Sequence, residues 1–352
     1  MKKFDPNAAC PSNDHFFGFP YSVEEASTVL VSVPWDVTTS YKPGAAKGPA
    51  SIRKASCQLD FFDYEVPFAW ESRIATLDSN LCAGVELSSS QIRPMASRII
   101  DHAENFSFDP NDDLDNENRK DDLLIVNQAC EMLNEWVFDT CQDLLNQHKR
   151  IGIVGGDHSV PLGFLKALSQ KYSQFGILHI DAHADLREAY EGFTYSHASI
   201  FYNALKIEQI QNLVQVGTRD LCPAEAEIIQ TCPNRIASFP DILLQKRRFE
   251  GESWSQLCKE IIEKLPQKVY ISFDIDGLEP SLCPHTGTPV PGGLSFAQVR
   301  YLLSQLRNSG KEIIGFDLCE VAPDLDNPKE EYDGNVGARI LYMLCLCLKP
   351  LA

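Results

Sequence analysis

The features that would place a chain in a membrane or send it out of the cell are missing from this sequence. It contains no run of 18 or more apolar residues, the length at which a membrane-spanning helix becomes a candidate. Its first residues, Met1-Lys-Lys-Phe-Asp-Pro6, lack the apolar core of a signal peptide. We therefore expect neither membrane insertion nor export, and we predict a cytoplasmic protein.

The sequence also has fewer basic than acidic residues, and its cysteines are not arranged in closely spaced pairs. The chain has 31 Lys and Arg against 49 Asp and Glu, a formal net charge of -18, whereas a nucleic-acid-binding protein normally carries a basic face. We therefore expect no nucleic-acid partner. The negative charge would favour encounter with cationic small molecules, although solubility is the simpler explanation. The 12 cysteines show none of the short paired spacings of a zinc site, so we predict reduced, mostly buried thiols.

What the sequence does contain is a regular alternation of short apolar segments and helical segments. Parallel strands need a crossover of about ten or more residues, so this order predicts parallel β-α-β units. The expected strands cover residues 28–33, 73–77, 151–154, 175–180, 213–216, 235–237, 268–273 and 313–316. Longer helices are expected at 123–147, 254–265, 295–308 and 336–348.

These segments predict an α/β fold with three α-β-α layers around a mostly parallel sheet of about eight strands. We expect a single domain over residues 1–352. Residues 1–28 show no clear periodicity and are predicted to form an N-terminal arm. Residues 101–122 are rich in Asp, Asn and Glu and are predicted to form an acidic surface insertion.

The stretch from Phe175 to Arg187 runs from an apolar strand directly into three polar residues at alternate positions. Side chains at i, i+2 and i+4 of an extended segment point to one side, so Asp181, His183 and Asp185 could converge. Carboxylates and imidazole together suit divalent first-row metal ions. The triplet alone could also be a solvated acidic turn.

A second stretch repeats this logic, because the strand ending at Phe273 runs into Asp274 and Asp276. Carboxylates this close repel each other unless cations compensate them. His158, after the glycine pair at 155–156, is a candidate further ligand, although such a histidine could be a structural hydrogen-bonding residue. Two divalent ions would cancel the four aspartates, and such pairs lie about 3.5 to 4 Å apart. Oxygen-rich ligands favour Mn²⁺ over Zn²⁺, with Ni²⁺ or Co²⁺ as alternatives.

Together these motifs resemble those of the ureohydrolase family, which comprises arginase, agmatinase and their relatives. The resemblance covers most of the chain and leaves out the N-terminal arm and residues 101–122. It rests on Gly-Gly-Asp-His-Ser at 155–159, Asp-Ala-His-Ala-Asp at 181–185 and Ser-Phe-Asp-Ile-Asp-Gly-Leu at 272–278. It extends to the segments 40–44, 48–53, 286–294 and 320–323. Two departures from the family pattern are Ala198, where glycine is common, and Glu279, where aspartate is usual.

The resemblance implies a centre of two Mn²⁺ ions, at which a bridging hydroxide attacks a guanidinium carbon to give urea and an amine. In that arrangement two aspartates bridge the ions and each ion has two further ligands. The bridging residues would be Asp181 and Asp274, the first ion would also bind His158 and Asp185, and the second His183 and Asp276.

The resemblance also implies roles in substrate binding and proton transfer. His197 matches the histidine that shuttles protons, Glu320 the carboxylate that pairs with the guanidinium, and Thr288 a threonine that lines the site. His197, Asp185 and Glu320 are therefore the expected catalytic residues, and Glu320, Thr288 and His197 the expected substrate-binding residues. On the residues alone, His197 could cap the following helix, Glu320 could lie at the surface, and Thr288 could belong to an ordinary turn.

The expected substrate is a cationic guanidino compound. Arginases carry an asparagine just after the middle motif, whereas Leu186 and Arg187 stand there in this chain, as in agmatinase-type members. Agmatine, hydrolysed to putrescine and urea, is therefore our first choice, with guanidinobutyrate, guanidinopropionate, guanidine or arginine as alternatives. Arg187 could anchor its loop through a salt bridge or bind a substrate carboxylate. The resemblance further implies a homo-oligomer, either a trimer or a hexamer.

Two functions of other classes fit part of the pattern. A single-zinc deacetylase would use an Asp, His, Asp set but would not require His158 and Asp276 for a second ion. A non-catalytic metal-binding protein would not need His197 and Glu320. Counting the bound metals tests the first alternative, and assaying activity tests the second.

Overall fold

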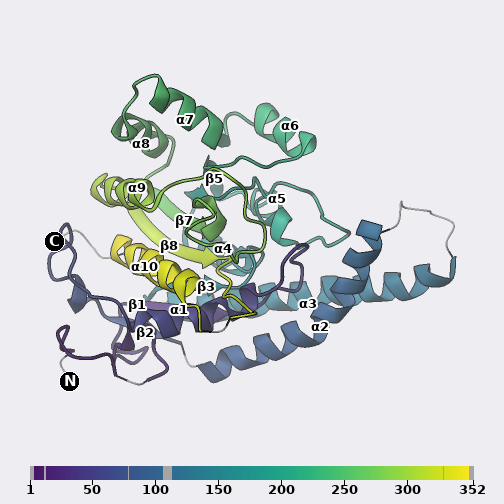
Figure 1. The fold of residues 1–352 in the computed structure, drawn as a ribbon, viewed down its shortest axis with the longest axis horizontal. Helices are drawn as coiled ribbons and strands as arrows, with labels where there is room; N and C mark the ends of the chain where they lie inside the picture. The colour runs from purple at the N-terminus through teal and green to yellow at the C-terminus, as the bar shows by residue number, and fades with distance from the viewer. Residues whose placement is uncertain (1–3, 12, 78, 106–112, 328, 349–352) are drawn as a thin grey trace.

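The computed structural model describes residues 4–348 except 12, 78, 106–112 and 328 (Figure 1). At its centre lies one eight-stranded sheet in the order β2-β1-β3-β8-β7-β4-β5-β6, and every neighbouring pair is parallel. This confirms the predicted parallel sheet. The strands are β1 (Thr28–Val33), β2 (Ile74–Thr76), β3 (Arg150–Gly155), β4 (Phe175–Ile180), β5 (Ile210–Val216), β6 (Ile236–Phe239), β7 (Lys268–Asp274) and β8 (Glu312–Cys319).

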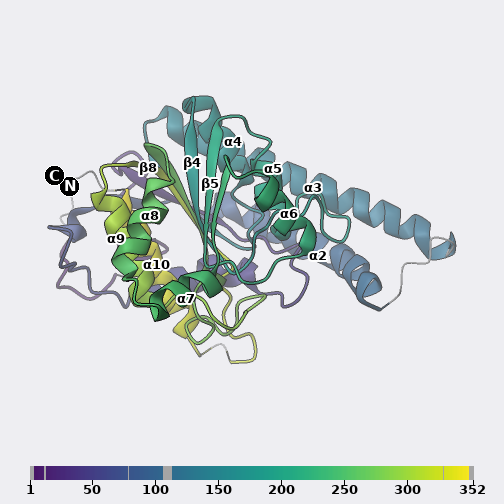
Figure 2. The same ribbon diagram turned by 90° about the horizontal axis from the view of Figure 1, so that it is seen from above.

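Helices cover both faces of the sheet (Figures 1 and 2), which gives the three layers expected from the sequence. One apolar core lies between the sheet and α1, α7, α8, α9 and α10, and a second lies between the opposite face and α2, α3, α4 and α5. The helices are α1 (Gly48–Ser56), α2 (Ser79–Asn105), α3 (Asp113–Asn146), α4 (Leu162–Lys171), α5 (Ile200–Ala204), α6 (Pro223–Thr231), α7 (Asp241–Phe249), α8 (Trp254–Glu263), α9 (Phe296–Asn308) and α10 (Tyr332–Cys347).

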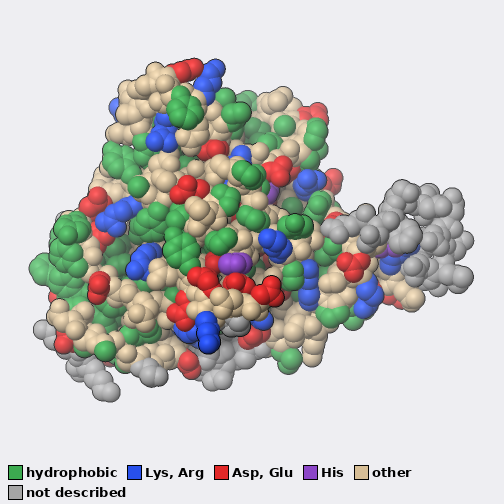
Figure 3. All heavy atoms as spheres, viewed as in Figure 1, with side chains coloured by type: hydrophobic (Ala, Val, Ile, Leu, Met, Phe, Trp, Pro, Cys, Tyr) green, Lys and Arg blue, Asp and Glu red, His purple; other side chains and the backbone are tan. Residues whose placement is uncertain are grey.

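Local sequence explains where several of these elements begin. All residues of β1 and of β4 are buried, as expected for strands that helices cover on both faces. Ser253 and Ser295 open α8 and α9 with capping boxes, in which each serine side chain accepts a hydrogen bond from the backbone N–H three residues later. Among the described residues, no helix is both long and apolar enough to cross a membrane. On the face in Figure 3, basic side chains are scattered among acidic and apolar ones.

The region predicted as an acidic surface insertion is largely helical. α2 and α3 form a long hairpin that projects from the body of the molecule (Figures 1 and 2). Residues 101–105 and 113–122 belong to the ends of these two helices, and 106–112 lie outside the described residues. A pair of hydrogen bonds from the Arg98 guanidinium to the Asp122 carboxylate joins the helices. Such a bidentate contact is between distant residues, so the local charge pattern could not reveal it.

The N-terminal arm contradicts the prediction that the cysteines are reduced. Cys10 forms a disulfide with Cys57, which lies 47 residues further along the chain just after α1. Phe16, Phe17 and Phe19 are buried, and this aromatic packing brings the arm against α1. The sequence spacing carries no sign of this long-range contact. Seven of the nine free cysteines among the described residues are buried, in keeping with the prediction that most thiols are buried.

Candidate active site

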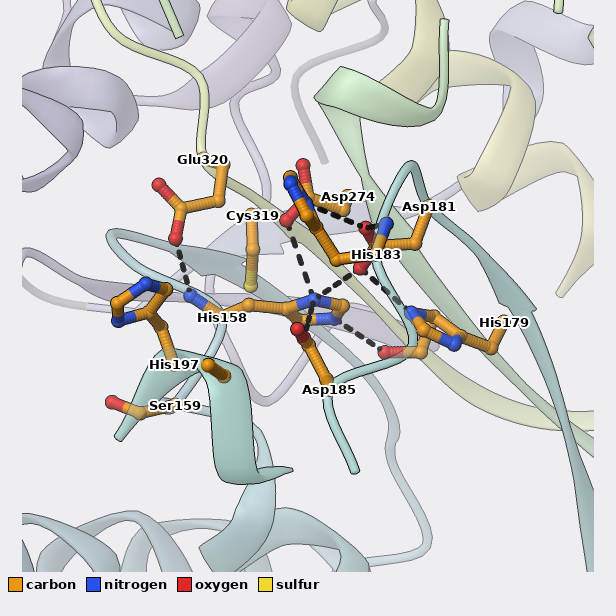
Figure 4. A network of polar contacts seen from close by, with 12 residues as sticks. His158, Ser159, His179, Asp181, His183, Asp185, His197, Asp274, Cys319 and Glu320 are labelled. Carbon is orange, nitrogen blue, oxygen red and sulfur yellow. Dashed lines mark hydrogen bonds and ion pairs between the residues drawn. The ribbon is translucent and has the colours of Figure 1, made fainter. Parts of the chain in front are cut away.

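Four neighbouring strands in the middle of the sheet end at the same edge, and each delivers predicted site residues there (Figure 4). β3 leads to His158, β8 to Glu320, β7 ends at Asp274 with Asp276 two residues later, and β4 leads to the segment 181–185. Ligands in open parallel sheets bind at the carboxyl ends of the strands. The structure therefore brings together all six side chains that the sequence singled out as metal ligands.

His158 lies at the centre of the first group. Its Nδ1 is 2.9 Å from Asp181 Oδ2, 3.1 Å from Asp185 Oδ2 and 3.3 Å from Asp274 Oδ2. Burial opposes protonation of this imidazole, but the surrounding carboxylates outweigh burial and raise the pKa of His158 well above its usual range. Three carboxylates that crowd one imidazole nitrogen are a donor set suited to a divalent cation.

His183 forms the second group. Its Nδ1 is 3.0 Å from Asp276 Oδ2 and 3.5 Å from Asp181 Oδ1. The backbone N–H of Ala182 donates to Asp276 Oδ1 at 3.0 Å, and the Thr288 hydroxyl donates to Asp276 Oδ2 at 3.4 Å. Asp181 faces both groups through different oxygens, which is the position that a carboxylate shared by two ions would occupy.

Two of the buried carboxylates, Asp185 and Asp274, lack enough positive charge around them. Burial, and then the charge of Asp181, raise the pKa of Asp185 to about 7. Burial, and then the charges of Asp276 and Asp181, raise the pKa of Asp274 well above its usual range. Groups of buried acids become stable as anions when cations lie between them. The residues present therefore fit a pair of divalent metal ions.

Two of the site residues have left-handed backbone conformations. Asp185 has φ 54° and Glu320 has φ 62°, values that residues other than glycine adopt at a cost in free energy. Glu320 is 5% exposed, and its Oε1 accepts a hydrogen bond from the His158 backbone N–H at 2.9 Å. Its Oε2 is buried and has no hydrogen-bond partner among the described residues. The strained backbone at 320 thus presents one unsatisfied carboxylate oxygen inside the protein rather than at the surface.

Behind the predicted ligands lies a layer of buried polar residues that was not predicted from the sequence. Gln215 Nε2 donates to His179 Nδ1 at 3.1 Å, so His179 carries its proton on Nε2 and donates to Asp181 Oδ2 at 2.7 Å. On the other side, Ser272 Oγ lies 2.9 Å from His158 Nε2 and donates to Asp317 Oδ2 at 2.7 Å. His179 precedes Asp181 by two residues and Ser272 precedes Asp274 by two. The alternation used to find the aspartates could therefore have identified both residues.

His197 lies at the start of a short 3₁₀ turn, His197–Ser199. The cap of this turn is Ser196, whose side chain accepts from the Ala198 backbone N–H at 3.2 Å, so the capping role considered for His197 belongs to its neighbour. The His197 backbone N–H donates to the Thr38 hydroxyl at 3.1 Å. Burial, and then the charge of His183, lower the pKa of the His197 imidazole to about 3, so this ring is neutral at pH 7.

A cavity of about 170 Å³ lies beside the second group of ligands. This volume is smaller than the roughly 300 to 1,000 Å³ of pockets for drug-sized ligands, which suits a small unbranched molecule. Glu320 is not part of its wall. The cavity is lined by Ser40, His183, Asp185, Arg187, Tyr190, His197, Ala198, Asp220, Leu221, Glu225 and Thr288.

Arg187 makes two contacts within this wall. Its Nε lies 3.8 Å from Glu225 Oε2, and its guanidinium lies over the Tyr190 ring at 4.7 Å from the centroid. The Arg187 backbone N–H also donates to the Ala198 carbonyl at 3.1 Å, which closes the loop that carries His197. Of the two roles considered for Arg187, the structure shows the anchoring salt bridge.

Comparison with known proteins gives concordant matches. The model of the Arginase family matches residues 26–347. N(1)-aminopropylagmatine ureohydrolase of Thermus thermophilus is 32% identical over 306 residues, which are 87% of this chain and 85% of the relative. Agmatinase of Salmonella enteritidis is 29% identical over 311 residues, 87% of this chain and 83% of the relative.

A solved structure shares the fold. The agmatine ureohydrolase of Thermoplasma volcanium superposes with a TM-score of 0.70 over 96% of this chain and 94% of its own, at 23% identity. The family match spans the sheet, the six clustered ligands and the loop of His197. On this evidence, the chain belongs to the arginase family.

Proposed function

We propose that this protein is a ureohydrolase that hydrolyses a guanidino compound to urea and an amine, and that agmatine, giving putrescine, is its substrate. The observation that carries the proposal is the pair of ligand groups that share Asp181, one around His158 and one around His183. A single-zinc deacetylase would leave the second group without a role. The arginase family depends on a binuclear metal centre, and the buried His and Asp clusters fit one.

The six ligands divide naturally between two ions. His158 and Asp185 would complete the first site and His183 and Asp276 the second, with Asp181 and Asp274 common to both. We propose Mn²⁺ because four of the six side chains offer oxygen, with Ni²⁺ or Co²⁺ as alternatives. When bound, such a pair of ions lowers the pKa of a water molecule so that it can act as a nucleophile at neutral pH.

The protein's own groups would handle the substrate and the protons. The His197 imidazole lies in the cavity wall, where it would accept a proton and pass it to the departing amine. The unsatisfied Oε2 of Glu320 is the acceptor that a guanidinium would require, and a carboxylate can bind two of its N–H groups at once. Thr288 lines the cavity and holds Asp276, so its hydroxyl would orient a ligand and contact substrate.

The wall of the cavity supports a substrate without a carboxylate. The Arg187 side chain already contacts the Glu225 carboxylate and the Tyr190 ring, so that its charge is partly neutralised. Agmatine therefore fits better than arginine or guanidinobutyrate. One relative is named for N(1)-aminopropylagmatine, a longer amine, so that compound belongs among the candidates.

A panel of substrates tests the proposal directly. Urea release is measured from agmatine, N(1)-aminopropylagmatine, arginine, guanidinobutyrate, guanidinopropionate and guanidine, each with Mn²⁺ and with Ni²⁺. We expect the highest kcat/KM for agmatine with Mn²⁺. No urea from any of these compounds with either metal would refute the proposed function.

The organisation of the protein beyond one chain is also a proposal. We infer a single domain, a trimer or hexamer, and a location in the cytoplasm, because family resemblance and sequence composition favour them. Light scattering of the purified protein measures the oligomeric state.

A further inference from the structure

Besides the predicted ligands, the cavity is lined by the charged residues Arg187, Asp220 and Glu225, and Arg187 and Glu225 neutralise each other. Glu225 is buried, and its two oxygens accept hydrogen bonds from the backbone N–H groups of Leu186 at 3.0 Å and Cys222 at 2.8 Å. The same carboxylate faces the Arg187 guanidinium. Glu225 and Arg187 therefore form the structural part of this wall and contribute little net charge to the cavity.

Asp220 is the third charged residue, and it differs from the other two. It lines the cavity and is exposed. Its carboxylate has neither a hydrogen bond nor an ion pair with any residue that the structure describes. One uncompensated negative charge therefore stands in the wall of the cavity beside the second group of ligands.

The backbone fixes Asp220 relative to these ligands. Its N–H donates to the Ala182 carbonyl at 3.1 Å, and Asp220 pairs with His183 as an isolated parallel bridge. The preceding Arg219 donates from its guanidinium to the carbonyls of Gly217, Asp276, Leu278 and Val290. This side chain ties the turn after β5 to the segment that carries Asp276. The backbone of Asp220 is thus fixed relative to the metal ligands, and such preorganisation favours binding of a substrate group.

We propose that Asp220 binds the ammonium group at the far end of the substrate and selects guanidino compounds that carry a second positive charge. The inference rests on the proposed function and deepens it. A guanidinium bound by Glu320 and an ammonium bound by Asp220 would each meet a carboxylate, whereas a substrate carboxylate at Asp220 would meet a like charge. The ligand class is a linear guanidine with a terminal or chain amine.

Asp220→Asn tests this role because it keeps the size of the side chain and removes its charge. On the manganese-loaded enzyme, agmatine is compared with n-butylguanidine, which has the same carbon chain without the amine. An exposed ion pair is worth about 1 kcal/mol, so we expect kcat/KM for agmatine to fall about fivefold, chiefly through KM. We expect no change for n-butylguanidine. Salt should weaken the wild-type preference, since the contact is solvent-accessible.

Glu188→Gln is the matched control, because Glu188 is an exposed carboxylate on the neighbouring loop that does not line the cavity. It should leave both substrates unaffected. An equal effect of Asp220→Asn on the two substrates, or no effect on either, would overturn the inference even though urea release upholds the proposed function.

Binding of 1,4-diaminobutane, measured by calorimetry, provides a readout that does not need turnover. Asp220→Asn should weaken this binding several-fold and Glu188→Gln should not. Unchanged binding in Asp220→Asn would overturn the role of Asp220 whether or not the enzyme releases urea. A failure of the proposed function would instead appear as no urea release by the wild-type enzyme.

Discussion

Replacing Glu320 by Gln should make the protein less active and, in its metal-free form, more stable. The activity should fall because the neutral amide of this variant cannot offer a charged acceptor to a guanidinium. Hydrogen bonds to charged groups contribute about 1.5 to 3 kcal/mol, which corresponds to a loss of about 10- to 100-fold in kcat/KM. Steady-state kinetics with agmatine and Mn²⁺ measures this loss.

The stability should rise because the Glu320 carboxylate is buried, and its Oε2 has no partner among the described residues. Burial, and then the charge of Asp157, raise the pKa of Glu320 well above its usual range. The folded protein therefore binds this proton more tightly than the unfolded chain does. The resulting stability is present below pH about 4.5 and is lost as the pH rises through the folded-state pKa. At pH 7 the Glu320→Gln variant does not lose this stability, because its amide does not ionise.

The size of the effect follows from the charge that the amide removes: the stability is lost at about 1.4 kcal/mol per pH unit above about pH 4.5, so the loss at pH 7 is about 1 to 3 kcal/mol. At about 2.1 cal/mol/K per residue, a chain of 352 residues has an unfolding entropy of about 0.74 kcal/mol/K. We therefore expect Glu320→Gln to raise Tm by about 1 to 4 °C at pH 7 in EDTA, with the difference disappearing near pH 4. Differential scanning calorimetry at the two pH values measures it.

Glu225→Gln is the matched control, since Glu225 is also a buried glutamate at the cavity. Both of its oxygens accept hydrogen bonds from backbone N–H groups, so an amide would place one N–H against another. This variant should lower Tm, opposite in sign to Glu320→Gln. If Glu320→Gln lowered Tm at pH 7, or if it kept the wild-type kcat/KM, the reasoning about Oε2 would be wrong.

The other predictions concern a metal ligand, the proton-transfer residue and the hairpin. Asp276→Ala should lose metal and activity together, as seen by elemental analysis and urea release. His197→Ala should keep both metals and lose at least about 100-fold in kcat, because general acid and base catalysis contributes that much. Asn127 on α3 donates to the Gly192 carbonyl at 3.2 Å and accepts from the Thr194 N–H at 2.9 Å. Asn127→Ala should therefore loosen the loop between Arg187 and His197 and raise KM about two- to fivefold.

Each of these variants has an outcome that would count against its premise. Metal loss in His197→Ala would mean that this residue supports the ligands rather than the proton transfer. Full metal occupancy in Asp276→Ala would remove this residue from the second site. Gln128→Ala, at the exposed neighbour of Asn127, is the control for the hairpin. Equal KM values in the two hairpin variants would show that the hydrogen bonds of Asn127 do not position the loop.

The strands and the ligands could be predicted from sequence because both depend on local patterns. A buried parallel strand is a short apolar run, and ligands that follow it alternate along an extended backbone. The helices α2, α6 and α7 were missed. α2 contains Gly84 and Pro94 and is weakly apolar. Contacts from elsewhere in the chain support it, including hydrogen bonds from Arg93 to the carbonyls of Asp36, Val37 and Thr39.

The details missed at the site have the same physical origin. The pairing of Arg187 with Glu225, the support of His158 by Ser272 and Asp317, and the Cys10–Cys57 disulfide all join residues that are distant in sequence. The buried, unsatisfied oxygen of Glu320 depends on a left-handed backbone that no propensity favours for glutamate. Such features follow from the assembled fold, and a pattern of single residues does not encode them.

The place of β8 in the sheet sets the order in which the centre can be completed. β8 is the last strand along the chain, yet it lies between β3 and β7 in the middle of the sheet. Before residues 312–319 leave the ribosome, strands β2, β1 and β3 cannot be joined through the sheet to β7, β4, β5 and β6. The first group leads to His158 and the second to the other five ligands. A nascent chain therefore has two half-sheets with open edges, and the first metal site, which needs His158 together with Asp181, Asp185 and Asp274, must await insertion of β8.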